Sequence, residues 1–282
     1  MVNKTARQLY EEACKKLKII EPNSYSFEVS QILEFVVGVT RLTLPIDGQK
    51  IVDNDKVEIF ESILEKRLAH QPLQYLLGEW EFYGLPIKVG EGVLIPRPDT
   101  EIVAETAIKI INDNSYKNVV DLCSGSGAIA IAIAANTNAD NIFAVELSNE
   151  AFPYLKENVL LNHFENKISP ILADGLKWQP KVKLDLIVCN PPYIPNSTIP
   201  TLDEEVLNEP MMALDGGDDG MDFYRKFAEI YYQYLNQNGA LVFEVGIDQS
   251  EIVSDILKNN SYRNITTSKD MLGIERCVVG IK

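Results

Sequence analysis

The sequence predicts an α/β protein: a doubly wound domain with a mostly parallel sheet, preceded by a small helical bundle and a β-hairpin linker. Two features of the pattern indicate this. Apolar residues recur at helical spacing in residues 1–78, whereas short β-branched runs alternate with helical stretches after Pro98. Such alternation is typical of a parallel sheet covered by helices. The length of 282 residues is in keeping with two domains.

Residues 1–78 are expected to form three helices. The first has apolar positions at helical spacing, namely Leu9, Ala13, Leu17 and Ile20. The second covers residues 27–37. The third follows Asn54 or Asp55, either of which can serve as its N-cap. The segment between the last two, TLPIDGQKIVDND, has the composition of turns.

A linker is predicted over residues 79–98. The stretches EFYGLPIKV and GVLIPR alternate in polarity and are rich in β-branched residues. Gly90 and Gly92 divide them, which predicts a hairpin with its turn at these glycines.

Residues 99–282 are expected to form the doubly wound domain with seven strands. The strands are predicted at 118–123, 141–146, 168–173, 184–189, 240–245, 263–267 and 276–281. Helices are predicted at 128–135, 150–163, 221–236 (ended by Gly239) and 249–259.

Composition limits the class of protein. The formal net charge is −15, which disfavours direct binding to a polyphosphate backbone. No apolar run approaches the roughly 20 residues that cross a bilayer, and the N-terminus lacks an apolar signal core. We therefore expect a cytoplasmic protein without a membrane anchor. The four cysteines are widely spaced and there are only two histidines, so we expect no metal site.

The first strand of this domain leads into a glycine-rich turn, VVDLCSGSGAIAIAIA. Gly125 and Gly127 let the backbone turn sharply and let a ligand approach the start of the following helix. Glu146 ends the next strand, where a carboxylate binds a ribose diol in nucleotide-binding βαβ units. Asp121, in position for an ammonium group, and the Asp174–Gly175 turn favour S-adenosylmethionine over a dinucleotide. Asp121 capping the loop and Asp174 forming only a turn remain alternatives.

The tetrapeptide Asn190-Pro191-Pro192-Tyr193 follows the fourth strand, which is expected to lie beside the first. In open parallel sheets, ligands bind beyond the carboxyl ends of the strands at such a point. The Asn190 side-chain oxygen and the Pro191 backbone carbonyl are two acceptors that suit a substrate NH₂ group. Tyr193 can stack on the planar group being methylated. The alternative is that the tetrapeptide is only a turn.

An amide or aromatic amine is a poor nucleophile because its lone pair is conjugated. Two acceptors that bind both N–H groups out of the conjugated plane would direct that lone pair at a sulfonium-bound methyl group, so the reaction needs mainly positioning. The nitrogen becomes strongly acidic after attack. No general base is therefore required, which agrees with the lack of a candidate catalytic His or Cys.

Together these residues resemble S-adenosylmethionine-dependent amino-methyltransferases, and the chain is similar to the release factor glutamine methyltransferase family, also called HemK or PrmC. The motifs that carry the resemblance are QPLQYLLGEWEFYG, IPRPDTE, NPPYIP, EPMMALDGGDDGMDFYR and FEVG. The resemblance implies a Rossmann-like methyltransferase domain and methylation of the Gln in the Gly-Gly-Gln loop of peptide chain release factors, giving N5-methylglutamine. It also implies that the helical domain docks the release factor.

The resemblance assigns site residues by motif. The catalytic residues are Asn190, Pro191 and Tyr193, and the substrate-binding residues are these three together with Pro192. The cofactor-binding residues are Cys123, Ser124, Gly125, Ser126, Gly127, Glu146, Asp174, Gly175 and Asn190, in addition to Asp121 from the reasoning above.

The chain departs from the family pattern at three positions. Cys123 stands where the loop usually has its first glycine, Glu146 replaces the commoner Asp, and Gly175 stands where some members have a large residue beside the adenine. These departures concern cofactor binding and not the transfer chemistry.

Three other functions remain possible from the sequence. A DNA or RNA amino-methyltransferase would use the same tetrapeptide on a flipped base, but the charge disfavours it and no long basic insertion is present. An NAD-dependent oxidoreductase would need an acid/base residue for hydride transfer. A scaffold without activity would leave the Asn190 pocket idle. A monomer is expected, and the role of Glu209–Gly217 is left open.

Overall fold

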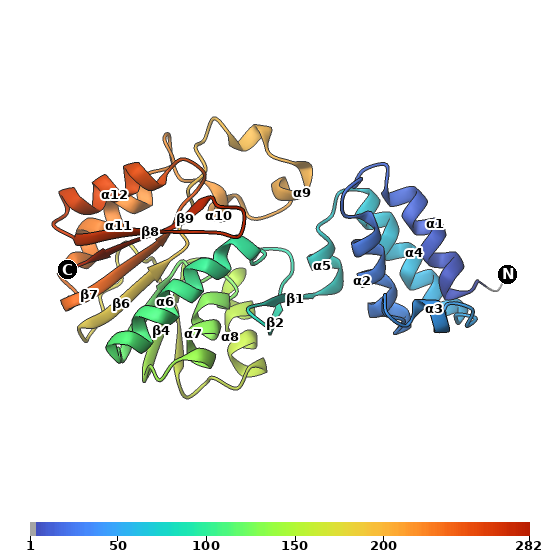
Figure 1. Ribbon diagram of the computed structural model, residues 1–282, viewed down its shortest axis with the longest axis horizontal. Helices are drawn as coiled ribbons and strands as arrows, with labels where there is room; N and C mark the ends of the chain where they lie inside the picture. Colours follow the sequence, from blue (N-terminus) through green and yellow to red (C-terminus); the bar gives the residue numbers. More distant parts are fainter. Residues whose placement is uncertain (1–3) are drawn as a thin grey trace. The chain divides into compact units, whose positions relative to one another are not determined.

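The computed structural model describes residues 4–282, which divide into two compact units (Figure 1). One unit comprises the described residues up to Gly78 together with Glu204–Asn208. The other comprises Glu79–Asp203 and Glu209–Lys282. Residues 1–3, the start of the first predicted domain, lie outside the described residues.

The first unit is helical. Its helices are α1 (Ala6–Leu17), α2 (Tyr25–Val37), α3 (Leu44–Asp47), α4 (Asn54–Leu68), α5 (Leu73–Leu77) and α9 (Glu204–Leu207). A capping box of Thr5 and Gln8 begins α1, since each side chain bonds the other's backbone N–H. The buried apolar faces of α1, α2 and α4 form the core, which includes Leu9, Ile32 and Phe60.

Two predictions for this unit were wrong in detail. Asp53, in an extended conformation, is the N-cap of α4, and Asn54 is already helical. Three consecutive residues, Asp53 to Asp55, are all good cap residues, so composition could not choose among them. The segment expected to be all turn contains α3, whose first turn accommodates Pro45.

The second unit begins with a hairpin of β1 (Glu79–Phe82) and β2 (Leu85–Lys88). Its turn is Tyr83-Gly84, with φ of 53° and 74°, which is typical of a tight two-residue hairpin. The prediction of a turn at Gly90 and Gly92 was therefore wrong. The residues after Gly92 are not a strand but run to the 3₁₀ turn Pro98–Thr100.

The main sheet has seven strands: β3 (Asn118–Leu122), β4 (Asn141–Glu146), β5 (Ile168–Leu172), β6 (Leu184–Cys189), β7 (Leu235–Glu244), β8 (Arg263–Lys269) and β9 (Glu275–Ile281). Their order is β5-β4-β3-β6-β7-β9-β8, and only β9 runs antiparallel to its neighbours. The predicted mostly parallel seven-stranded sheet is confirmed. The chain order reverses between β3 and β6, so their carboxyl ends form a switch point.

Helices cover both faces of this sheet (Figure 1). One side carries α6 (Glu101–Asn114), α7 (Ala128–Asn136) and α8 (Ala151–Leu161), and the other carries α11 (Asp222–Tyr232) and α12 (Ser250–Asn259). The short elements Ile199–Thr201 and α10 (Met211–Leu214) lie in the connection after β6. The alternating Ala and Ile side chains of α7 are buried almost throughout, because this helix packs against both the sheet and its neighbouring helices.

The boundary between α11 and β7 differs from the prediction. The helix ends at Tyr232, and β7 starts at Leu235, five residues earlier than expected. Leu235 pairs with Leu184 of β6, and the register shifts before the next pair, Leu186 with Ala240. The helical periodicity continues through this segment, but pairing with β6 decides its conformation.

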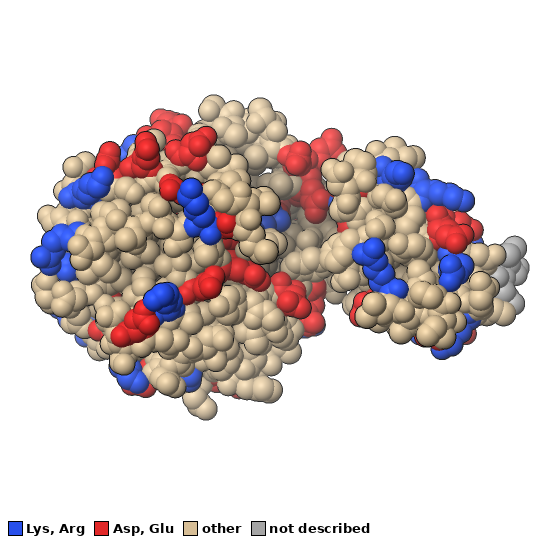
Figure 2. Space-filling view, in the orientation of Figure 1, with Lys and Arg blue, Asp and Glu red and all other residues tan. Residues whose placement is uncertain are grey.

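Within residues 4–282, no helix is long and apolar enough to cross a membrane. On the face shown in Figure 2, basic and acidic side chains are interspersed over the larger unit.

Candidate active site

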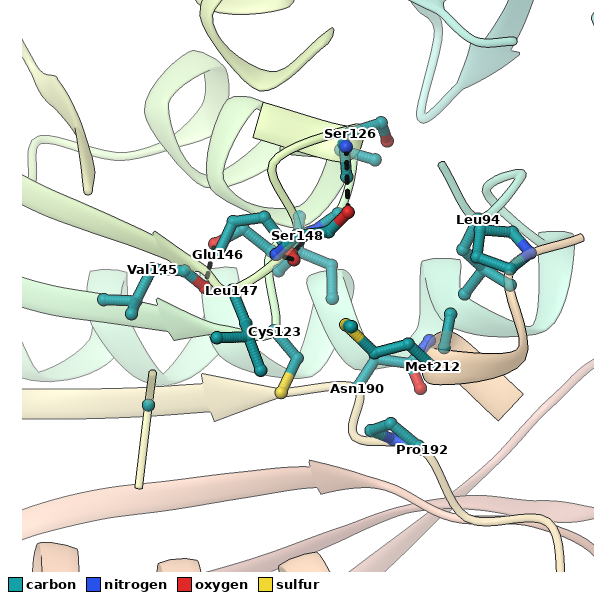
Figure 3. Close-up of a pocket in the computed structure, with 18 of the residues that line it drawn as sticks. Leu94, Cys123, Ser126, Val145, Glu146, Leu147, Ser148, Asn190, Pro192 and Met212 are labelled. Carbon is teal, nitrogen blue, oxygen red and sulfur yellow. Dashed lines mark hydrogen bonds between the residues drawn. The ribbon is translucent and has the colours of Figure 1, made fainter. Parts of the chain in front are cut away.

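A cavity opens at the carboxyl ends of β3 to β6 (Figure 3). It encloses about 1050 Å³, its open mouth included, which is enough for a cofactor-sized ligand. Its lining includes Cys123, Ser124, Gly125 and Ser126 after β3, Glu146 and Ser148 at the end of β4, Asp174 and Gly175 after β5, and Asn190 and Pro192 after β6. Most of the predicted site residues therefore meet in one place.

The turn after β3 holds a strained backbone. Gly125 and Gly127 have φ of 53° and 83°, and a Cβ on Gly127 would come within 2.5 Å of Leu155 Cδ1. Cys123 also has a positive φ of 58°, a conformation that favours glycine and costs other residues on the order of 1 kcal/mol. Cys123 is thus accommodated in this turn at a cost in backbone energy.

Glu146 is held rigidly at the end of β4. Its Oε2 accepts from the Gly125 N–H at 2.7 Å, and its Oε1 accepts from the Ser148 N–H at 2.6 Å. Only 7% of the residue is exposed. The carboxylate therefore braces the glycine turn and keeps its remaining lone pairs for a ligand in the cavity.

The turn after β5 supplies a second carboxylate. Asp174 accepts from the Leu176 N–H at 2.9 Å and pairs with Lys177, and this lysine lowers the pKa of the aspartate. Gly175 lies against the Phe227 ring. An aromatic surface from α11 thus lies beside this turn.

Asp121 does not lie on the cavity lining. It is fully buried, and its Oδ2 accepts from the Ala130 N–H in the first turn of α7 at 3.1 Å. Burial raises its pKa to about 8, so the carboxyl is largely neutral at pH 7. The side chain lies behind the loop and caps α7 through Oδ2, so the direct contact with an ammonium group stays a prediction beside the capping alternative.

Only part of the tetrapeptide lines the cavity. Asn190 and Pro192 line the cavity, whereas Pro191 is buried and the Tyr193 hydroxyl donates to Glu244 Oε1 at 3.4 Å. The Asn190 amide nitrogen donates to Thr100 Oγ1 at 3.4 Å. The NH₂ end of the Asn190 side chain is thus engaged, and Oδ1 is the end left for a ligand.

The segment Glu209–Gly217 packs against the tetrapeptide. The Ile194 N–H donates to the Leu214 carbonyl at 3.0 Å, and the Gly216 N–H donates to the Ile194 carbonyl at 2.9 Å. Gln249 adds a bond from its side-chain nitrogen to the Tyr193 carbonyl at 2.9 Å. The backbone after Asn190 is therefore braced from two sides, a role that the sequence left open.

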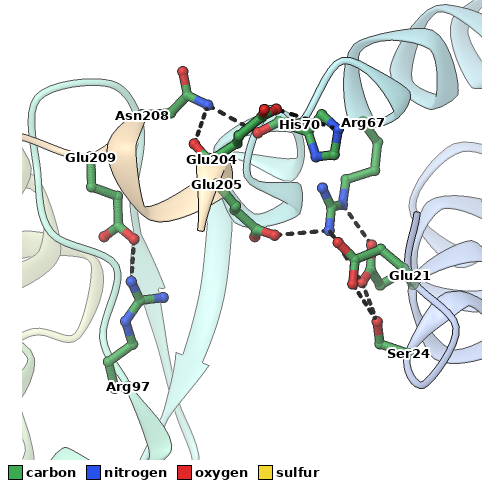
Figure 4. A network of polar contacts seen from close by, with 10 residues as sticks. Glu21, Ser24, Arg67, His70, Arg97, Glu204, Glu205, Asn208 and Glu209 are labelled. Carbon is green, nitrogen blue, oxygen red and sulfur yellow. Dashed lines mark hydrogen bonds and ion pairs between the residues drawn. The ribbon is translucent and has the colours of Figure 1, made fainter. Parts of the chain in front are cut away.

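Glu209 fixes the start of that segment. Its side chain is fully buried, and it accepts from the Ile95 N–H at 3.0 Å and from the Arg97 guanidinium (Figure 4). The next residues, Pro210 and Met212, lie on the cavity lining. The opposite charges in IPRPDTE and EPMMALDGG are the signal that could have paired these motifs in the sequence.

The five residues before Glu209 belong to the helical unit. There Glu205 pairs with Arg67, which is only 1% exposed and also binds Glu21 and Glu28 at 2.7 and 2.6 Å (Figure 4). One buried cation thus holds three carboxylates from separate parts of the chain. Such a cluster depends on every partner, since removing one leaves uncompensated buried charge.

We expect Arg67→Met to lower the free energy of unfolding by about 3 kcal/mol, because Glu28 would stay buried without its counter-charge. Urea denaturation followed by circular dichroism measures the change. Lys66→Met is the matched control, since Lys66 is the exposed neighbour on α4. Equal losses in the two variants would contradict the importance of the cluster.

Comparison with known proteins places the chain in a family. Residues 8–78 match the family described as PrmC N-terminal domain, and residues 102–212 match the TRM5/TYW2 methyltransferase domain. The release factor glutamine methyltransferase of Thermodesulfovibrio yellowstonii is 37% identical over 91% of this chain and 94% of its own. That of Moorella thermoacetica is 33% identical over 99% of both chains. The chain belongs to the release factor glutamine methyltransferase family.

This membership confirms the resemblance inferred from the motifs. A further member of the family, from Fusobacterium nucleatum, is 38% identical over 90% of this chain and 73% of its own. The protein is therefore an S-adenosylmethionine-dependent methyltransferase. A solved methyltransferase from Pyrococcus furiosus shares the fold with a TM-score of 0.54, at 16% identity over 71% of this chain and 90% of that one.

Proposed function

We propose that the protein methylates the side-chain amide of the glutamine in the Gly-Gly-Gln loop of peptide chain release factors, giving N5-methylglutamine. The observation that carries this proposal is the position of Asn190. It follows β6 at the switch point and lines the same cavity as the glycine turn and Glu146. The family's members named above, which match nearly the whole chain, support the choice of substrate.

The cavity residues suit S-adenosylmethionine. Glu146 would accept from the ribose hydroxyls with the lone pairs that the backbone amides leave free. Residues 123–127 would lie along the cofactor, and the Asp174–Gly175 turn would border its adenine. When bound, S-adenosylmethionine supplies an electrophilic methyl group on a positively charged sulfur.

The tetrapeptide would orient the glutamine amide. Asn190 Oδ1 and the Pro191 carbonyl would accept its two N–H groups, which directs the nitrogen lone pair toward the cofactor. Pro192 would contact the amide from the lining, while the Tyr193 ring supports the pocket from the side. Rate enhancement in this scheme comes from positioning, and no residue needs to act as a general base.

Three segments of the chain have different proposed tasks. Residues 1–78 would dock the release factor, residues 79–98, which include the β1–β2 hairpin, would link this domain to the next, and residues 99–282 would carry out the transfer. The enzyme is acidic and its proposed substrate is a protein. We expect it to act as a monomer in the cytoplasm, without direct contact to nucleic acid.

Transfer to purified release factor tests the proposal. The protein is incubated with the release factor and S-adenosylmethionine labelled in its methyl group, and the label is located by peptide mass spectrometry. We expect one label on the Gly-Gly-Gln peptide. A parallel incubation contains DNA or RNA in place of the release factor. Label on the nucleic acid, with none on the Gly-Gly-Gln peptide, would refute the substrate assignment.

Glu146→Gln is expected to weaken binding of S-adenosylmethionine by about 10- to 100-fold. The substitution removes a charged acceptor for the ribose, worth about 1.5–3 kcal/mol, and places an NH₂ group against one of the two backbone N–H donors of Gly125 and Ser148. Isothermal titration calorimetry measures the affinity. The matched control is Glu157→Gln on the exposed side of α8, which should bind as the wild type does. Equal affinity in both variants would exclude Glu146 from the cofactor site.

A further inference from the structure

Two residues outside the tetrapeptide lie directly behind Asn190. Thr100 ends the 3₁₀ turn before α6 and is 4% exposed. Glu244 is the last residue of β7, the strand that pairs with β6, and is 2% exposed. Thr100 Oγ1 accepts from the Asn190 amide nitrogen at 3.4 Å. The nearby Thr100 hydroxyl also acts to lower the pKa of Glu244, which favours the ionised carboxylate.

Glu244 is an unusual group to bury. Its Oε1 accepts from the Tyr193 hydroxyl at 3.4 Å, but its Oε2 has no hydrogen-bond partner within residues 4–282. Removing a carboxylate from water without full compensation costs stability. A buried acid that is retained beside a ligand cavity is therefore a candidate for a functional role.

The two ends of an Asn side chain have almost the same shape but opposite hydrogen-bonding character. If the Asn190 amide rotated by half a turn, its NH₂ group would face the cavity and meet the N–H groups of the substrate. Hydrogen bonding behind the residue must decide which end points forward.

An ionised Glu244 would fix which end of the Asn190 amide faces the cavity. A carboxylate only accepts hydrogen bonds, so the single proton of the Thr100 hydroxyl is drawn toward it. Thr100 then presents only lone pairs to Asn190, and only the NH₂ end of the amide can bind there.

We propose that Glu244 and Thr100 are positioning residues that hold the Asn190 amide with Oδ1 toward the substrate nitrogen. This role rests on the proposed function, in which Asn190 accepts a hydrogen bond from the glutamine amide.

Protonation of Glu244 would reverse the hydrogen-bond directions between Glu244, Thr100 and Asn190. The acid could then donate to Thr100, and the Thr100 proton would be free to bind Asn190 Oδ1 and turn the amide around. Burial raises the pKa of Glu244 to about 7, so the ionised form is lost as the pH falls through that value. The titratable and charged groups around Glu244 are Asp99, Cys189, Tyr193, Tyr224, Arg276 and Cys277.

Thr100 variants test the proposal through kcat. Thr100→Val keeps the shape but removes the acceptor, and it should lower kcat about tenfold, the effect of one hydrogen bond. Thr100→Ser keeps the hydroxyl and should recover most of that loss. Both should bind S-adenosylmethionine as the wild type does, with similar melting temperatures. Thr106→Val, which removes a hydroxyl from α6 outside the cavity, is the control and should keep the wild-type kcat. Equal losses in the Val and Ser variants at position 100, or no loss in either, would overturn the proposal.

Glu244→Gln tests the pH dependence. The wild-type kcat should rise with pH through about 7, and this variant should lose that inflection. An inflection that persists unchanged in Glu244→Gln would contradict the role of Glu244.

A readout without release factor separates this proposal from the proposed function. In ¹⁵N NMR spectra, the side-chain NH₂ signals of Asn190 should shift with a midpoint near pH 7 in the wild type and lose that titration in Thr100→Val. If the wild type methylates no release factor but this titration is present, the substrate assignment fails while the orientation of Asn190 stands. If methylation occurs but the signals do not titrate, the positioning role fails.

Discussion

Asn190→Ala is expected to lower the rate of methyl transfer by about 10²–10³ while S-adenosylmethionine remains bound. The side-chain oxygen is one of two acceptors proposed to orient the glutamine nitrogen, and losing one preorganised hydrogen-bonding group of this kind costs roughly that factor. The main contacts proposed for the cofactor come from other residues, namely the turn after β3, Glu146 and Asp174. Single-turnover kinetics measure the transfer step, and calorimetry measures cofactor affinity.

Asn196→Ala is the matched control for this experiment. Asn196 lies in the same connection after β6 and is exposed. Its side-chain nitrogen lies 3.5 Å from Asp218 Oδ1, which is a weak hydrogen bond. Its variant should transfer methyl groups at the wild-type rate. A rate for Asn190→Ala within a few fold of the wild type would rule out the acceptor role of Asn190.

Gly216→Ala is expected to reduce kcat by about 10- to 100-fold. A Cβ at this position would lie 2.7 Å from the Tyr193 Cα and 2.8 Å from its carbonyl carbon, so the tetrapeptide backbone or the 209–217 segment must move. A displacement approaching 1 Å in a catalytic group can cost about 10²-fold in rate. The cofactor contacts after β3 and β4 are separate from this packing, so affinity for S-adenosylmethionine should change little.

Gly38→Ala controls for the general effect of replacing a glycine. Gly38 ends α2 with a φ of 77°, and a Cβ there would meet no atom within 4 Å. This variant should lose about 1 kcal/mol of stability through backbone strain and keep the wild-type kcat. If both variants lose activity equally, close packing of Gly216 on Tyr193 is not what holds the site together.

Most acidic residues around the site have a compensating partner of their own. Glu146 is compensated by backbone N–H groups, Glu209 by Arg97 and a backbone N–H, and Asp174 by Lys177. Glu244 is the least compensated of these acids, with one oxygen lacking a partner among the described residues. Among these four acids, Glu244 is therefore the carboxyl most sensitive to pH near neutrality.

Features that depend on contiguous residues could be predicted from the sequence. The run Leu184–Cys189 is β-branched and apolar, and the two prolines after Asn190 end it, so the strand and the position of the tetrapeptide follow from local chemistry. Glu146 at the end of β4 follows in the same way, because parallel strands bring their carboxyl ends to one edge.

Features that depend on residues distant in the chain could not be predicted from the sequence. The N-cap of α4 and the start of β7 were misplaced because several residues had equal local preference and pairing decided between them. Asp121 was assigned to the cofactor because its position beside the loop was clear, whereas the direction of its side chain depends on the packing of α7.

By itself, the sequence determined the fold class, the order of the strands in the chain, and the residues that reach the edge of the sheet, since periodicity and turn chemistry are local. Only the tertiary structure decided what holds those residues in place. Thr100 meets Asn190 across 90 residues of chain, and Arg97 meets Glu209 across 112. Such contacts arise only when the sheet and its connections have packed, because buried polar groups must then find partners wherever the fold brings them.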